Sequence, residues 1–178
     1  GKLGLGDFED SYNPALIDFF HNHVEFNNIN SISVGVNESF FLKRDGTVFM
    51  TVNYLPEVFP MPSDVKIKDL CAGYTATTGC FFITENDEVY CYGANNSGQL
   101  GLGVDDLTIS VPTLIRTDNL GNRFDNIKKV SSGAYHTLFL KNDGNVYSCG
   151  TGVQLAVGDG GKINSPNRII SFNNNIKD

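Results

Sequence analysis

The sequence has no tryptophan, only 2 methionines, and few basic residues: Lys and Arg number 13 against 20 Asp and Glu, for a formal net charge of −7. No apolar run approaches the ~20 residues of a membrane-spanning helix. A nucleic-acid-binding surface usually carries a basic stripe, because neutralised phosphates supply most of its affinity. We therefore expect no membrane span and no direct nucleic-acid partner. A basic or neutral protein surface fits the charge better.

The four cysteines form no C-x-x-C pair, and their spacings match no common zinc or disulfide framework. We expect free, buried thiols in a reducing compartment. This indicates an intracellular protein, without distinguishing nucleus from cytoplasm. No signal peptide is visible, although the chain begins at Gly1 rather than at a methionine.

Glycine and strand-forming residues are abundant: the chain has 19 Gly, 13 Phe and 7 Tyr, and 40% of its residues are hydrophobic. Phe, Tyr, Val and Ile favour strands, and glycine favours turns. The composition therefore predicts an all-β globular fold.

The chain also repeats itself. "VSSGAYHTLFLKNDGNVYSCG" (130–150) aligns with "ISVGVNESFFLKRDGTVFMTV" (32–52), and a third copy occupies 70–93. A glycine block, "GQLGLGV" (98–104), answers "GKLGLGD" (1–7) and returns degraded as "GVQLAVGDG". Because self-similarity at such spacing is typical of repeat architectures, we assign 1–178 to one domain with approximate copies at 1–28 (the tail of a repeat), 29–66, 67–126 and 127–175.

Each copy is predicted to hold four short antiparallel strands. In the last copy these are "IKKVSS" (127–132), "HTLFL" (136–140), "NVYSC" (145–149) and an outer strand that begins at the proline of "PNRII" (166–170). Asp-Gly between the second and third strands is a strong hairpin signal, and proline is tolerated at the start of an edge strand. Four short strands, repeated, describe a propeller blade.

These residues resemble repeats of the regulator of chromosome condensation (RCC1) family, most closely at 130–150 and 92–103. The resemblance implies a seven-bladed β-propeller that acts as a guanine-nucleotide exchange factor or as a protein-binding platform. Glu38 and Ala76 stand where the repeat usually has the histidine found at His136. About three blades leave open ends with unpaired edges, so we expect further blades, from the same polypeptide or another segment, to close the ring.

The glycine block does not match a nucleotide-binding loop. Its order is G-x-x-G-x-G, with no helical pattern and no Gly-Lys-Ser/Thr after it. We expect Leu100 and Leu102 to anchor the loop to its blade. The recurring positions are interpreted as structural: Gly35, Gly46, Gly73, Gly93, Gly98, Gly101, Gly103, Gly133, His136, Gly144 and Gly150.

No catalytic constellation is apparent, and the chain is not expected to be an enzyme. Ser131 or Ser132 with His136 and Asp143 resembles a triad only in composition, and the other copies do not preserve the set. We expect the His136 ring nitrogens to satisfy blade backbone groups. A further candidate, a metal site at His21, His23 and Glu25, lacks a fourth ligand. No metal and no cofactor are predicted.

Two groups of residues are candidates for partner binding. Asp105, Asp106 and Asp118 are predicted to lie on loops at the propeller faces, where they can attract a basic partner. Phe59 and Met61 belong to the proline-rich segment 54–65, which has no glycine block. Exposed apolar residues there would anchor a partner; the alternative is that they pack under the neighbouring blade.

We therefore interpret the chain as an RCC1-like protein-interaction module that works through its face loops. The alternative is a guanine-nucleotide exchange factor for a small GTPase, which the resemblance alone implies. Exchange needs only tighter binding to the nucleotide-free GTPase than to the loaded one, and no general acid or base. Fold does not fix function, and no exchange residue can be assigned from the repeat pattern.

Overall fold

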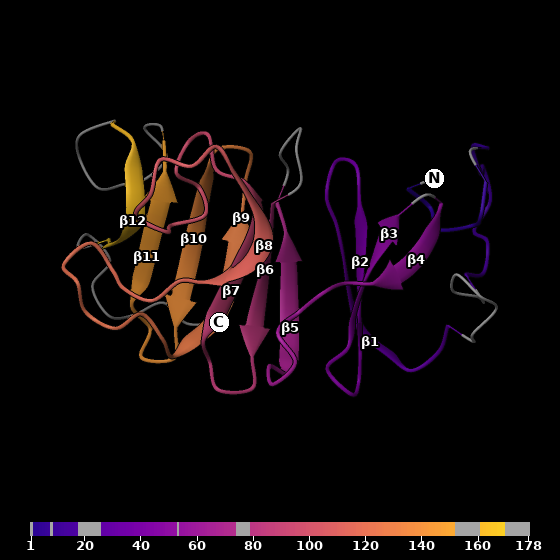
Figure 1. Ribbon diagram of the computed structural model, residues 1–178, viewed down its shortest axis with the longest axis horizontal. Coiled ribbons are helices and arrows are strands. Elements are labelled where there is room, and N and C mark those ends of the chain that lie inside the picture. Colours follow the sequence, from indigo (N-terminus) through magenta and orange to yellow (C-terminus); the bar gives the residue numbers. More distant parts are fainter. Residues whose placement is uncertain are drawn as a thin grey trace.

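The structure is a computed structural model that describes residues 2–7, 9–17, 26–52, 54–73, 79–151 and 161–169. These residues form three four-stranded antiparallel sheets, each made from one continuous stretch of chain (Figure 1). We call them blades I, II and III. The all-β, propeller-type fold predicted from the sequence is confirmed.

Within each blade the strands follow chain order from the inner to the outer edge. Blade I holds β1 (Ile29–Val34), β2 (Ser39–Lys43), β3 (Val48–Val52) and β4 (Leu55–Val58). Blade II holds β5 (Ile67–Ala72), β6 (Gly79–Thr84), β7 (Val89–Ala94) and β8 (Thr108–Leu114). Blade III holds β9 (Ile127–Ser132), β10 (His136–Lys141), β11 (Val146–Gly150) and β12 (Ile163–Arg168).

Each central hairpin turns at a residue whose backbone adopts the left-handed conformation. Gly46 and Gly144 have φ of 87° and 83°, and Asp87 takes the same place in blade II with φ of 62°. The carboxylates of Asp45 and Asp143 accept the N–H groups of the residues two positions on, each at 2.9 Å. These hydrogen bonds lower the pKa of both carboxyl groups. The Asp-Gly signal in the sequence therefore predicted real hairpins.

The inner strands approach one another closely at their C-terminal ends, where each is followed by a glycine. A Cβ on Gly35 would lie 3.4 Å from the carbonyl oxygen of Gly73. A Cβ on Gly73 would lie 2.7 Å from Oγ of Ser132 and 3.4 Å from the carbonyl oxygen of Gly133. Contact between blades therefore requires glycine at position 73 and leaves little room for a side chain at position 35.

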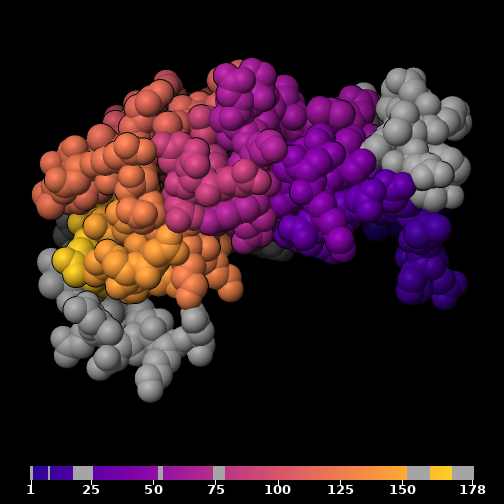
Figure 2. All heavy atoms as spheres, turned by 90° about the horizontal axis from the view of Figure 1, so that it is seen from below, coloured from indigo at the N-terminus to yellow at the C-terminus, as the bar shows by residue number. Residues whose placement is uncertain are grey.

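Alternate residues of each strand face opposite neighbours, so the hydrophobic cores lie between blades. Figure 2 shows the blades side by side in chain order, from indigo to yellow. The I–II core contains Phe40, Leu42, Val48, Phe59, Ile67, Leu70, Cys80 and Phe82. The II–III core contains Phe81, Ile83, Val89, Cys91, Leu100, Ile115, Phe124, Ile127, Val130, Phe139 and Cys149.

The outer strands begin earlier than the sequence predicted. Pro112 and Pro166 lie inside β8 and β12 rather than at their first residues. Both prolines fall within register shifts, between the partners of Cys91 and Gly93 and between those of Ser148 and Gly150. Each also lies on an outer edge strand, and a bulge on such a strand needs no N–H at the proline.

All four cysteines are free: Cys80, Cys91 and Cys149 are buried and Cys71 is half-buried. Burial raises the pKa of each thiol. The free thiols agree with the sequence analysis, while the compartment stays a prediction. The part of the chain that is described contains no helix long and apolar enough to cross a membrane.

Candidate interaction site

The glycine block lies between β7 and β8, and its backbone N–H groups are already in use. Gly98 donates to the carbonyl of Asn95 at 2.9 Å, Gly101 to that of Gly98 at 3.1 Å, and Gly103 to that of Asn164 at 2.7 Å. All three glycines have φ between 72° and 73°. Because carbonyl groups occupy these donors, the block does not present them to a phosphate. This agrees with its interpretation as a structural element.

The block also connects two blades, which the sequence analysis did not predict. Leu100 is fully buried in the II–III core. A Cβ on Gly101 would lie 3.1 Å from Sγ of Cys149 and 3.3 Å from Pro166, both in blade III. The block therefore leaves blade II and covers the outer strand of blade III.

The N-terminal block makes the same kind of contact with blade I. The N–H of Gly6 donates to the carbonyl of Tyr54 at 3.0 Å. A Cβ on Gly4 would lie 3.4 Å from Thr51 and 3.5 Å from Pro56. In both cases a block glycine donates to the residue two positions before the proline of an outer strand.

Gly150 is the last residue of β11 and Gly93 the last but one of β7, with φ of 112° and 107°. A Cβ on Gly150 would overlap the carbonyl oxygen of Tyr135. The His136 ring covers Gly133, where a Cβ would lie 2.8 Å from Cε1. No hydrogen bond to the His136 ring is found within the described residues, and the role expected for its nitrogens stays a prediction.

A catalytic triad is not assembled. His136 begins β10 and Asp143 lies in the turn after it, so the strand separates them. Ser132 Oγ instead contacts Oγ1 of Thr137 at 3.0 Å. Across the described ranges, no group of three or more His, Cys, Asp or Glu side chains could hold a metal ion. His21, His23 and Glu25 lie outside those ranges.

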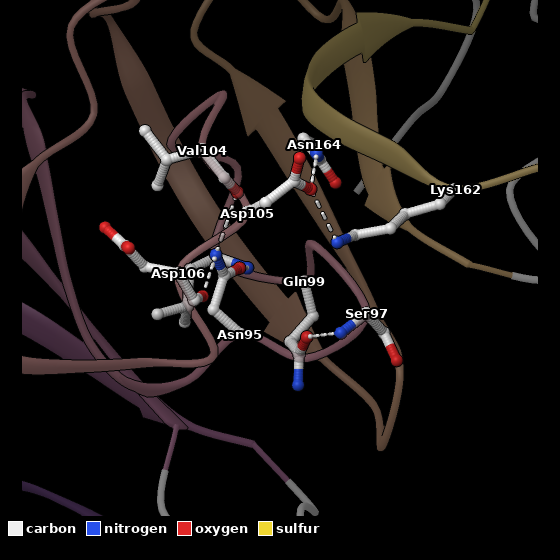
Figure 3. A network of polar contacts seen from close by, with 9 residues as sticks. Asn95, Ser97, Gln99, Val104, Asp105, Asp106, Lys162 and Asn164 are labelled. Carbon is white, nitrogen blue, oxygen red and sulfur yellow. Dashed lines mark hydrogen bonds and ion pairs between the residues drawn. The ribbon is translucent and has the colours of Figure 1, made fainter.

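Asp105 and Asp106 follow the glycine block on an exposed loop (Figure 3). Oδ1 of Asp105 accepts hydrogen bonds from Nζ of Lys162 at 2.9 Å and Nδ2 of Asn164 at 2.8 Å. These contacts lower the pKa of the Asp105 carboxyl group. The buried Asn95 amide holds the loop from beneath, donating to the carbonyls of Val104 and Asp106 at 3.3 and 3.0 Å.

Exposed apolar residues adjoin these carboxylates in the loop, and another lies at the same end of blade III. Leu107 and Tyr135 are each 64% exposed, and Val104 is exposed to a smaller degree. Tyr135 lies at the same end of blade III as the Asp105 contacts, because its carbonyl accepts the N–H of Thr151 just after β11. We call Val104, Asp105, Asp106, Leu107 and Tyr135 the face patch.

Asp118 does not belong to this surface, contrary to the sequence prediction. It is only 8% exposed. Its carboxylate accepts the N–H groups of Leu120 and Asn122, each at 2.9 Å, and the Asn122 side-chain amide at 3.1 Å. Asp118 therefore shapes its own loop and is not available to a partner.

Phe59 and Met61 are likewise not partner anchors. Phe59 is 4% exposed, stacks on Phe82 at 5.1 Å and meets Tyr92 edge-on at 4.9 Å. Met61 is half-buried against the same core. Residues 55–58 of the proline-rich segment form β4 rather than a loop. The alternative, that these residues pack under the neighbouring blade, is correct.

The two residues that hold Asp105 and the apolar neighbours of the carboxylates were not among the sites predicted from the sequence. Lys162 and Asn164 come from the next repeat, 57 and 59 positions away. Leu107 follows Asp106 directly, so an acidic pair beside an apolar residue was the available signal. Tyr135 precedes the histidine position of its copy and could be found only from the blade geometry.

Known proteins resemble the chain in sequence and in fold. Residues 86–140 and 127–159 match the family described as regulator of chromosome condensation (RCC1) repeat. The ultraviolet-B receptor UVR8 of Arabidopsis thaliana is 29% identical over 96% of this chain. The guanine nucleotide exchange factor SRM1 of Saccharomyces cerevisiae is 27% identical over 69%. The chain spans 40% of the receptor and 28% of the exchange factor.

A solved structure shows the same fold. The crystal structure of Prp20p from Saccharomyces cerevisiae superimposes with a TM-score of 0.74 and 18% sequence identity, covering 94% of this chain and 44% of that one. The repeated blades, the matched repeats and these relatives agree with one another. Residues 86–159 carry RCC1 repeats, and the described residues of the chain form three blades of an RCC1-like β-propeller.

Proposed function

We propose that the chain is part of a protein-interaction module that binds a basic protein surface through the face patch. The observation that carries the proposal is the arrangement around Asp105 and Asp106, two exposed carboxylates with exposed apolar side chains beside them. Lys162 and Asn164 fix Asp105 in one orientation, which reduces the entropy lost on binding. The net charge of −7 favours encounter with a basic partner.

A second candidate function is nucleotide exchange on a small GTPase. The observation in its favour is the similarity to SRM1, which is named an exchange factor. Another relative, UVR8, is named a receptor, so relatives with these repeats differ in activity. Exchange requires only that the surface bind the nucleotide-free GTPase more tightly than the loaded one. The face patch could do this without acid–base groups.

The test uses the full-length protein carrying Asp105→Lys and Asp106→Lys together. The matched control is Asp64→Lys with Glu85→Lys, which makes the same charge change at exposed acidic residues outside the face patch. For a partner bound by the wild type, we expect the face-patch variant to bind about tenfold more weakly, and increasingly so at low salt. An equal loss in the control would show that net charge alone decides binding.

The same preparation distinguishes the second candidate. Release of a labelled guanine nucleotide is measured from any small GTPase that the full-length protein binds. Acceleration by the wild type, lost in the face-patch variant, would assign exchange to this surface. Binding without acceleration would leave the interaction module and contradict exchange on that GTPase.

A further inference from the structure

Glycine blocks cover the outer strands of blades I and III at equivalent positions. The acceptor carbonyls belong to Tyr54 and Asn164, each two residues before the proline of its strand. Pro56 and Pro166 are both buried. Burial of a proline beneath a glycine block is thus a repeated feature of the rim of this propeller.

Blade II has the same strand, and among the described residues no glycine block covers it. The pairing of Gly93 with Ile109 corresponds to that of Gly150 with Ile163, so Ser110 corresponds to Asn164 and Pro112 to Pro166. Ser110 is exposed and Pro112 is only half-buried. Val111 between them is 65% exposed. We call Ser110, Val111 and Pro112 the rim site.

Blade I cannot supply the missing segment. Its third strand ends at Val52 and its fourth begins at Leu55, whereas residues 95–107 connect β7 to β8 and include the block that covers blade III. Two residues cannot reach the neighbouring blade, because an extended residue spans at most ~3.6 Å. The connection between β3 and β4 therefore does not cover the rim site.

In blade II, the space that corresponds to the one occupied by Leu100 beside blade III is already filled. Tyr92 corresponds to Cys149, since each pairs with the second residue of its neighbouring strand. Phe59 packs edge-on against Tyr92. A segment at the rim site therefore needs no side chain equivalent to the buried Leu100. It needs only a backbone that approaches Val111 and Pro112 closely.

We propose that the rim site receives, in trans, an extended glycine-rich segment of a partner protein. The segment donates a backbone N–H to the carbonyl of Ser110 and lays glycines against Pro112, as the two resident blocks do on Tyr54–Pro56 and Asn164–Pro166. Glycine is required because a Cβ at Gly101 already comes within 3.3 Å of Pro166. The inference deepens the proposed interaction role by naming a class of partner, and it uses residues outside the face patch.

The experiment measures binding of a synthetic peptide with the block sequence Gly-Gln-Leu-Gly-Leu-Gly-Val to the full-length protein with labelled valine methyl groups. We expect a saturable shift of the Val111 methyl signals. A peptide with alanine at its second and third glycines should bind at least about tenfold more weakly, because each Cβ would meet the strand. The methyl signals of Val104, in the face patch, should not move.

A matched variant, Val111→Lys, should lose the peptide while keeping the fold, since the side chain is exposed. Three results would overturn the inference: no shift at Val111 up to millimolar peptide, equal binding of the alanine peptide, or unchanged binding to Val111→Lys. The variant carrying Asp105→Lys and Asp106→Lys should bind the peptide normally. If the peptide does not bind the rim site but a basic partner still binds the face patch, only the rim-site inference is overturned. If the peptide binds but the face patch does not bind a basic partner, only the proposed function is overturned.

Discussion

The two junctions between blades solve the same packing problem with different residues. The II–III junction uses a glycine block that carries Leu100, together with Phe124, whose ring lies 5.2 Å edge-on from Phe139. Within the part of the chain that the structure describes, no glycine block lies at the I–II junction, and Phe59 lies against Phe40, Phe82 and Tyr92. At the I–II junction, Phe59 thus takes the place that Leu100 and Phe124, from two separate segments, share at the II–III junction.

Chain length explains the difference. Residues 60–66 join Phe59 to β5, while residues 116–126 join Ile115 to β9 and include Phe124. Phe59 and Ile115 are equivalent, since their N–H groups donate to the carbonyls of Val48 and Val89 at 2.8 and 3.0 Å. The shorter connection contributes the half-buried Met61 and Val65 to the core but has no aromatic residue like Phe124. A larger side chain after the outer strand compensates for it.

The largest effect is expected from Phe59→Ala. Removing a buried aromatic ring costs about 3–5 kcal/mol of unfolding free energy, and the Phe59 ring contacts three other aromatic rings that would lose this packing. Phe124→Ala should fall at the lower end of that range, because Leu100 and Ile115 remain beside it. Urea denaturation of each variant measures the difference.

If Phe59→Ala destabilises the protein less than Phe124→Ala, the junctions are not related by this compensation. Phe59→Leu serves as the control, because it retains an apolar side chain. It should recover part of the loss, which a role in binding a partner would not explain.

A smaller effect is expected from Gly98→Ala in the block itself. The left-handed backbone costs any alanine about 1–2 kcal/mol, and here the new Cβ also meets Asn164 and the carbonyl oxygen of Ile163. Gly144→Ala isolates the backbone cost, since φ is 83° and nothing lies within 4 Å of its Cβ. Gly98→Ala should exceed this control by about 1–3 kcal/mol of overpacking.

Equal losses of unfolding free energy in the two glycine variants would mean that close packing of the block against blade III adds no cost to Gly98→Ala. The comparison uses thermal or urea unfolding of both proteins under one condition. Any excess then belongs to the contact between blades rather than to the turn.

The sequence repeats made the fold predictable. The site was difficult to predict where the repeat pattern is interrupted. The alignment of 130–150 with 32–52 gave the strands, the hairpins and the glycine positions, because each depends on local spacing. The segment 54–65 matched no other copy, so its Phe59 could be assigned to a partner or to the core. Only the packing against Phe82 decides between them.

Polar residues showed a similar limit. Asp105 and Asp118 are both acidic residues beside turns, and the sequence treated them alike. One is exposed and held by residues from the next repeat, and the other is buried by its own loop. Asp105 differs from other exposed acidic residues because it contacts residues far away in the sequence. No local spacing in the sequence predicts these contacts.

The smallest expected effect concerns how often each junction opens. Cys80 lies in the I–II core, and Cys91 and Cys149 lie in the II–III core. Burial raises the pKa of all three thiols, so alkylation requires local opening that exposes a thiolate. Because no glycine block closes the I–II junction, we expect Cys80 to react a few-fold faster than the other two, while half-buried Cys71 reacts first.

Mass spectrometry of the native protein after timed alkylation with iodoacetamide measures these rates. Gly101→Val should raise the rates of Cys91 and Cys149 and leave Cys80 unchanged, since a Cβ at Gly101 meets Cys149 Sγ and Pro166. Equal rates at Cys80 and Cys91 in the wild type would mean that the block adds nothing to closure. The II–III junction would then owe its stability to its side-chain core alone, as the I–II junction does.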